Sequence, residues 1–219
     1  MYHSIQEYLI NKKVTLVAVS KTHPDSAILD LYHKNQRIFG ENKVQELVGK
    51  YDRLPKDINW HFIGHLQRNK VKYIAPFIDT IHSIDSLRLL KEISKQALKN
   101  NRVIKCLIQI KIAQEEEKYG IAPPDLSNFF EEITKENLTG ISIVGLMGMA
   151  TYTDNTVQIK KEFKLLQKIF NEVKTSYFSV AEDFRELSMG MSEDYQLAVE
   201  CGSTMVRIGS LIFGKRDYQ

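Results

Sequence analysis

Lys21 stands where an apolar run ends and a polar segment begins. Residues 14–19 are uninterrupted, apolar and rich in β-branched side chains, and Ser20, Lys21 and Thr22 follow them. Such a run predicts a strand that is covered on both faces, and the carboxyl ends of parallel strands form the ligand side of a barrel. Burial there favours the neutral, nucleophilic form of a lysine amine, which imine formation requires. Lys21 is therefore a candidate nucleophile, although a lysine in an exposed loop before a helix has the same local sequence.

A second candidate site lies near the end of the chain, where small and hydroxyl residues follow two predicted strands. Ser188 ends one strand, and Gly209 and Ser210 follow the next. Their backbone amides and the Ser188 hydroxyl could donate hydrogen bonds to a phosphate group, although such glycines also serve in tight turns. Arg207 favours a binding site, because an arginine at the end of an apolar strand needs a buried acceptor.

Short apolar runs alternate with helical patterns along the whole chain. We expect strands at residues 15–20, 37–40, 60–64, 80–84, 103–110, 141–147, 184–188 and 204–208. Residues 86–100 and 159–173 repeat apolar side chains at the spacing of amphipathic helices, and Pro123 begins another helix. This alternation is typical of βα units with a parallel sheet. Without a linker or a Gly-x-Gly-x-x-Gly motif, residues 1–219 are predicted to form one α/β domain, a closed (β/α)₈ TIM barrel rather than an open doubly wound sheet.

Composition argues against several classes of function. The 30 basic and 27 acidic residues are nearly balanced, so a nucleic-acid partner is not expected. No apolar run approaches the length of a membrane span and no secretion signal begins the chain, which predicts a cytoplasmic protein. Cys106 and Cys201 lack metal-binding spacing and the histidines show no His-Glu-x-x-His pattern. We therefore expect two buried free thiols and no metal site.

A series of short motifs extends over nearly the whole chain. They are residues 18–22 (AVSKT), 39–42 (FGEN), 60–70 (WHFIGHLQRNK), 82–85 (HSID), 145–147 (GLM), 187–192 (LSMGMS), 207–209 (RIG) and 212–214 (IFG). Each motif is weak alone, but in this order they resemble the pyridoxal phosphate homeostasis proteins. This family is related to the barrel domain of alanine racemase.

The resemblance implies a fold-type III barrel that carries pyridoxal 5′-phosphate (PLP) as an imine on Lys21. The other cofactor-binding residues that it implies are Asn42, Met147, Ser188, Arg207, Gly209 and Ser210. In this assignment Arg207 faces the pyridine nitrogen, and Ser188, Gly209 and Ser210 hold the phosphate. Asn42 and Met147 line the cofactor.

The loop after the fifth predicted strand carries an accessory candidate, Lys118. It falls where the family has a lysine before a small residue and a glycine, and it could open the imine or anchor PLP a second time; a solvated loop lysine is the alternative. Three features depart from the family pattern: Lys111 replaces an asparagine, Tyr119 replaces a small residue, and residues 148–150 lack the proline that often follows the Gly-Leu-Met segment. His61 and His82 are expected in the barrel interior, where hydrogen bonds satisfy them.

The resemblance implies PLP buffering or delivery in vitamin B6 homeostasis, without robust catalysis and with no catalytic residue. Arginine can only donate, so Arg207 would favour an unprotonated pyridine nitrogen, which is a poor electron sink. The chain ends five residues after Gly214, so we expect no C-terminal β domain of the kind that brings an acid/base tyrosine to racemases. A monomer is expected for the same reason, with apo PLP-dependent enzymes as candidate recipients.

Two other functions fit some of the same residues. One is a fold-type III racemase or decarboxylase that acts on a small amino acid with weak or unrecognised acid/base chemistry. The other is a barrel aldolase that uses Lys21 without a cofactor and binds a sugar phosphate at the glycine-rich segment.

Overall fold

The barrel is closed by eight parallel strands. The computed structural model describes residues 1–115 and 119–214. In these residues each strand pairs with the next along the sequence, and the last pairs with the first. The strands are β1 (Thr15–Val19), β2 (Ile38–Glu41), β3 (Asn59–Phe62), β4 (Thr80–Ile84), β5 (Ile104–Ile110), β6 (Ile141–Gly148), β7 (Glu186–Ser188) and β8 (Met205–Ile208). The predicted TIM barrel is confirmed.

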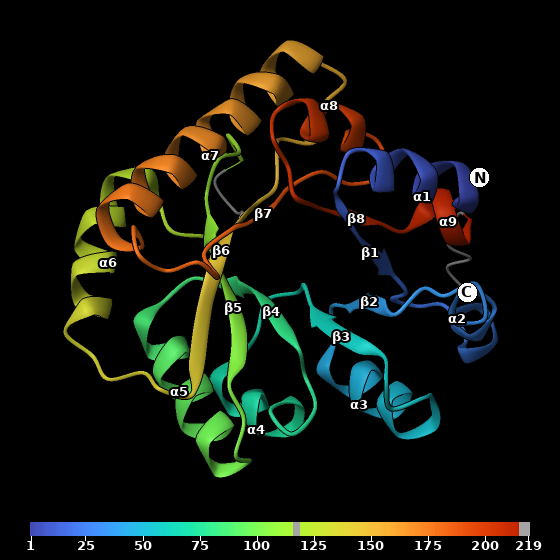
Figure 1. Cartoon of the computed structure of the whole chain (residues 1–219), viewed down its shortest axis with the longest axis horizontal. Coiled ribbons are helices and arrows are strands. Elements are labelled where there is room, and N and C mark those ends of the chain that lie inside the picture. Colours follow the sequence, from blue (N-terminus) through green and yellow to red (C-terminus); the bar gives the residue numbers. More distant parts are fainter. Residues whose placement is uncertain (116–118, 215–219) are drawn as a thin grey trace.

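Helices surround the strands on the outside (Figure 1). They are α1 (Tyr2–Asn11), α2 (Asp25–Tyr32), α3 (Val44–Arg53), α4 (Val71–Ile74), α5 (Leu87–Lys99), α6 (Leu126–Thr134), α7 (Thr156–Tyr177), α8 (Tyr195–Glu200) and α9 (Ser210–Phe213), with 3₁₀ turns η1 (Arg68–Lys70) and η2 (Pro123–Asp125). The helices predicted at residues 86–100 and 159–173 correspond to α5 and α7. The apolar stripe of α7 is buried, and so is that of α5 except near its end, where Leu98 is half exposed. None of the helices in the described ranges combines the length and the apolar character needed to cross a membrane.

Residues along each strand alternate between the helices and the barrel interior, which we call the lumen. In β1, Leu16 and Ala18 belong to the main apolar core beneath the helices, whereas Val17 does not. A Cβ placed on Gly40 of β2 would lie 2.9 Å from Cγ1 of Val17 and 3.3 Å from Cδ1 of Ile63. These three positions therefore face the lumen, as the two-residue period of a barrel strand requires.

Gly145 marks an irregularity in β6. The register between β5 and β6 shifts after Cys106, so that Leu107 pairs with Gly145. Gly145 has a φ of 156°, and a Cβ at this position would collide with the carbonyl oxygen of Glu186 in β7. Only glycine allows this close approach of the two strands.

The predicted state of the two cysteines is confirmed, because Cys106 and Cys201 are both buried and free. β7 is shorter than the expected strand at residues 184–188. Phe184 precedes it instead and is fully buried, stacking on Phe178 with ring centroids 4.3 Å apart.

Candidate functional site

Lys21 lies in a turn directly after β1. The amide of His23 donates to the carbonyl oxygen of Ser20 at 3.1 Å and closes the turn. Ser20 is fully buried and points outward, since its hydroxyl donates to Glu41 Oε1 at 2.6 Å beneath the helices. Lys21 is the next residue of this turn, at the carboxyl end of β1. The structure thus places partly buried Lys21 at the carboxyl-end opening of the barrel.

Arg207 brings together the ends of three strands inside the lumen. It pairs with Val17 of β1 in register, and 4% of its surface is exposed. Its Nη1 donates to Ser188 Oγ at 2.6 Å, and its Nη2 donates to the carbonyl oxygen of Gly148 at 3.0 Å. Burial lowers the pKa of Arg207 to about 10, a value at which it still carries its charge at neutral pH. Among the described residues, no carboxylate lies within ion-pair distance of this guanidinium.

A row of hydrogen bonds continues from Arg207 across the lumen, and we call Asp79, His61, His82, Ser188 and Arg207 the polar row. Ser188 Oγ lies 3.1 Å from His82 Nδ1, and His82 Nε2 lies 2.9 Å from His61 Nδ1. His61 Nε2 lies 3.5 Å from Asp79 Oδ2. The expectation that both histidines are lumen residues satisfied by hydrogen bonds is confirmed.

The hydrogen bonds of the polar row all donate in one direction, from Arg207 and Ser188 toward Asp79. The Asp79 carboxylate can only accept, so with neutral imidazoles His61 donates to it through Nε2, His82 donates through Nε2 to His61 Nδ1, and Ser188 donates to His82 Nδ1. Burial holds the pKa of His82 well below its usual value, and the charge of Arg207 acts in the same direction. Burial alone would raise the pKa of Asp79, but hydrogen bonds from His61 and Thr80 lower it below its usual range.

The glycine-rich corner lies between β8 and α9. The amide of Gly209 donates to Ser192 Oγ at 3.3 Å, and a Cβ on Gly209 would lie 3.1 Å from the carbonyl oxygen of Val19. Gly209 therefore sits against the last residue of β1, just before Lys21. Ser192 belongs to a motif of the sequence but was not predicted as a site residue, while the predicted Ser188 lies deeper, on Arg207. The motif alone could not distinguish two serines four residues apart.

The remaining predicted residues lie around the same end of the barrel. Asn42 directly follows β2, and its backbone packs against Gly64 after β3, where any side chain would collide with the Asn42 carbonyl oxygen. Met147 in β6 is 1% exposed and pairs in register with Ser188. Ser210 begins α9. Lys118 lies outside the described residues.

Three side chains from neighbouring loops meet at this opening without having been predicted together. His65, after β3, stacks on Tyr119 with ring centroids 4.1 Å apart. Its Nδ1 lies 3.4 Å from Oδ2 of Asp85, which follows β4. Lys111 directly follows β5 at the same end. Loops between different strands supply these residues, so the sequence offered no spacing signal for them.

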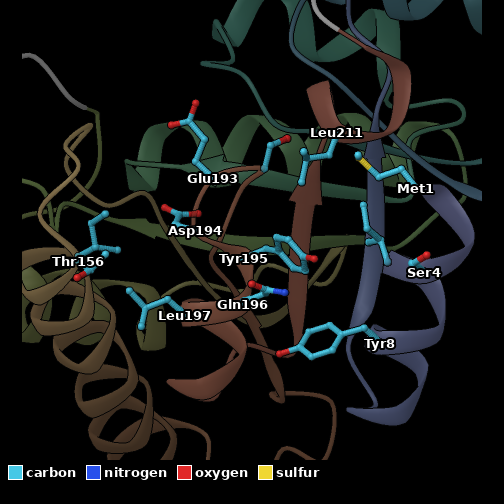
Figure 2. A pocket seen from close by; sticks show the side chains of 13 residues that line it. Met1, Ser4, Tyr8, Thr156, Glu193, Asp194, Tyr195, Gln196, Leu197 and Leu211 are labelled. Carbon is cyan, nitrogen blue, oxygen red and sulfur yellow. The ribbon is translucent and has the colours of Figure 1, made fainter.

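A cavity of about 720 Å³ adjoins the site at Ser192 and Leu211. It lies between α1, α8 and the start of α7 (Figure 2). Tyr8 and Tyr195 line it, with their rings edge to face and the ring centroids 5.9 Å apart. Its lining contains neither Lys21 nor Arg207, so the cavity is separate from the lumen.

Comparison with known proteins identifies the family of this barrel. The model of the alanine racemase N-terminal domain family matches residues 2–217. A pyridoxal phosphate homeostasis protein of Aquifex aeolicus is 41% identical over 93% of this chain and 87% of its own length. The chain belongs to the family of pyridoxal phosphate homeostasis proteins. The resemblance predicted from the motifs is therefore confirmed.

Further members of the family extend the match. The human pyridoxal phosphate homeostasis protein is 38% identical over 93% of this chain and 77% of its own length. The structure of PipY from Synechococcus elongatus PCC7942 with PLP bound has a TM-score of 0.82 and 34% identity, and the match covers 92% of this chain and 93% of PipY.

Proposed function

We propose that this barrel, residues 1–219, binds PLP through Lys21 and serves in PLP homeostasis as a carrier or buffer. The observation that carries the proposal is the buried guanidinium of Arg207, which lies beside β1 and hydrogen-bonds to two neutral acceptors. Support also comes from the relatives named pyridoxal phosphate homeostasis protein and from PipY, whose structure has PLP bound.

The residues at the opening suit the chemistry of PLP. Ser188 and Gly148 engage two of the five N–H donors of Arg207, and a pyridine nitrogen is the kind of neutral acceptor that another donor can serve. The amine of Lys21 matches the aldehyde of the cofactor. The amide of Ser210 and the hydroxyl of Ser192 supply donors for a phosphate group, and the amide of Gly209, which donates to Ser192 Oγ, orients that hydroxyl. The donor set therefore fits the group.

Each residue of the site then has a distinct role. Lys21 would hold the cofactor covalently, Arg207 would donate to its ring nitrogen, and Ser188 orients Arg207. Asn42 and Met147 line the cofactor. PLP, when bound, supplies an aldehyde that exchanges between amines and a ring that withdraws electrons.

The polar row favours holding the cofactor over turnover of amino acids. Arg207 remains a cation and can only donate, and the groups behind it are neutral donors directed away from it. None of them can deliver a proton to the ring nitrogen. We further propose that the protein acts as a cytoplasmic monomer and that apo PLP-dependent enzymes are the recipients of its cofactor.

Borohydride reduction of the PLP-incubated protein, followed by peptide mass spectrometry, tests the proposal. We expect a pyridoxyl adduct on Lys21 that disappears in Lys21→Ala and persists in Lys34→Ala, which removes an exposed lysine before β2 at the opposite end of the barrel. An adduct spread over surface lysines would contradict the site. Rapid exchange of amino-acid α-protons into deuterated solvent would contradict the carrier role and favour a racemase or decarboxylase.

A further inference from the structure

Behind the turn of Lys21, on the outer side of the barrel, lies a buried group of charges. Lys50 of α3 is 3% exposed, and its Nζ donates to the Ser20 carbonyl oxygen at 2.7 Å, to Glu41 Oε1 at 2.8 Å and to Glu46 Oε1 at 2.7 Å. An ammonium group has three N–H donors, so all of them are used. We call Lys50, Glu41 and Glu46 the Lys50 cluster.

The Lys50 cluster holds both peptide groups that flank Lys21. The carbonyl oxygen of Ser20 belongs to the peptide group before Lys21 and accepts from Lys50. The amide of Thr22 belongs to the peptide group after Lys21 and donates to Glu46 Oε1 at 2.6 Å. The backbone of Lys21 is thus bonded on either side to one helix.

The held turn is a strained one. Thr22 has a φ of 68°, in the left-handed region that a β-branched residue seldom adopts, and its side chain is exposed to solvent. Such a conformation persists only where surrounding interactions impose it, and it is commonest at functional sites. The hydrogen bond from Thr22 to Glu46 is one interaction that imposes it.

Stability alone is a poor explanation for the Lys50 cluster. Glu41 is fully buried, and its Oε2 has no hydrogen-bond partner among the described residues. Burial raises the pKa of Glu41 despite the opposing effect of Lys50. Replacing buried charges by well-packed apolar side chains is often neutral or stabilising, so a buried ion group is better explained by the geometry that it imposes.

We infer that Lys50 and Glu46 are positioning residues that fix the backbone of Lys21, so that its amine stays at the place where the cofactor binds. The inference rests on the proposed function of Lys21. Without the Lys50 cluster the strained turn relaxes, the amine samples other positions, and PLP is held less tightly and less selectively.

Three variants and one control test this role. Lys50→Met removes the ammonium, Glu46→Ala removes the acceptor of Thr22, and Glu46→Gln keeps an oxygen that can accept from it. The matched control is Gln36→Met, because Gln36 is also buried and also links β1 to β2. Its Nε2 donates to the carbonyl oxygens of Leu16 and Ile38, at the opposite end of these strands from Lys21. Glu46 is partly exposed, so Glu46→Ala remains usable if Lys50→Met does not fold.

The measurements are the dissociation constant for PLP, the share of reduced adduct found on Lys21, and the melting temperature. We expect Lys50→Met and Glu46→Ala to weaken PLP binding at least tenfold and to spread the adduct to other lysines, with most of the loss restored in Glu46→Gln. Gln36→Met should lower the melting temperature yet leave binding within about twofold.

Two outcomes overturn the inference. Either Lys50→Met and Glu46→Ala bind PLP as tightly and selectively as the unmodified protein, or Gln36→Met weakens binding as much as they do. Absence of an adduct on Lys21 in the unmodified protein is a different result, since it overturns the proposed function itself.

Discussion

At the scale of single residues, the chemistry of this barrel depends on how Arg207 is buried. A guanidinium in the lumen is tolerated because Ser188 Oγ and the Gly148 carbonyl oxygen accept hydrogen bonds from it. Ser188 in turn donates a hydrogen bond to His82 Nδ1. Hydrogen bonds in such a buried row strengthen one another, and leaving one of them unmade lowers the free energy of unfolding. His82 must remain neutral for the row to keep its direction.

The pH dependence of stability should therefore report on His82. Its imidazole titrates near pH 6.5 in the unfolded chain, whereas burial and the charge of Arg207 keep the folded-state pKa well below that value. The unfolded state binds more protons below about pH 6.5, so the folded state loses stability as the pH falls. From pH 7.5 to 5.5 the loss from this one group is about 1.4 kcal/mol.

Denaturant titrations of the protein and of His82→Gln at both pH values measure this contribution. Glutamine can accept from Ser188 and donate to His61, so the polar row is kept while the titration is removed. We expect the difference in pH dependence between the two proteins to match the loss from His82. Identical pH dependence would show that His82 is not held neutral by the fold.

At the scale of elements, strand ends and turns decide which side chains reach the opening. Ser20, just after β1, points outward to Glu41, and Lys50 and Glu46 of α3 hold the turn in which Lys21 follows it. The bulge at Gly145 acts in a similar way in β6, because it shifts the register against β5 so that Met147 pairs with Gln109.

Two glycines allow a matched test of the bulge. In Gly145→Ala the new Cβ would strike the Glu186 carbonyl oxygen at a φ of 156°, so we expect a loss of about 2–4 kcal/mol in the free energy of unfolding. Gly49, inside α3, would meet only the end of the Arg53 side chain, at 3.1 Å. Gly49→Ala should therefore gain about 0.5–1 kcal/mol from helix propensity. Urea unfolding measures both, and similar effects for the two variants would contradict the bulge.

At the scale of the whole molecule, the proposed site spans the seam where the barrel closes. β1 and β8 pair over four registered positions, with Lys21 after one strand and Arg207 in the other. A cofactor held by both residues bridges the first and last strands of the barrel. Of all paired strands, β1 and β8 are the farthest apart in the sequence, so the connecting chain does least to keep this pair together. A ligand bonded to both strands therefore opposes their separation.

Hydrogen exchange should reveal this bridging. At a PLP concentration 100-fold above the dissociation constant, the free energy of unfolding rises by about 2.7 kcal/mol. We expect the slowing of amide exchange to be largest in β1 and β8 and smallest in β4 and β5, and to be absent in Lys21→Ala. Amides that exchange through global unfolding slow equally in every strand, so the test is made on amides that exchange through local opening. Among these, equal slowing in all strands would contradict a cofactor placed across the seam.

Much of this protein could be read from patterns close together in the sequence. Apolar runs and helical stripes predicted each of the strands β1 to β8 to within a few residues, because their periodicity is a local consequence of burial. The place of Lys21 after β1 and of Arg207 in β8 followed from the same runs. The motifs, taken in order, identified the family.

Other features depend on contacts between distant segments, and these only the folded barrel decides. Ser188 rather than Ser192 reaches Arg207 because β7 and β8 bring positions 188 and 207 together in the lumen, 19 residues apart in the chain. Lys50 reaches the peptide groups around Lys21 because α3 packs over β1 and β2. Hydrogen bonds act over about 3 Å in space, so the partner of a buried polar group is set by packing, which the local order of residues does not encode.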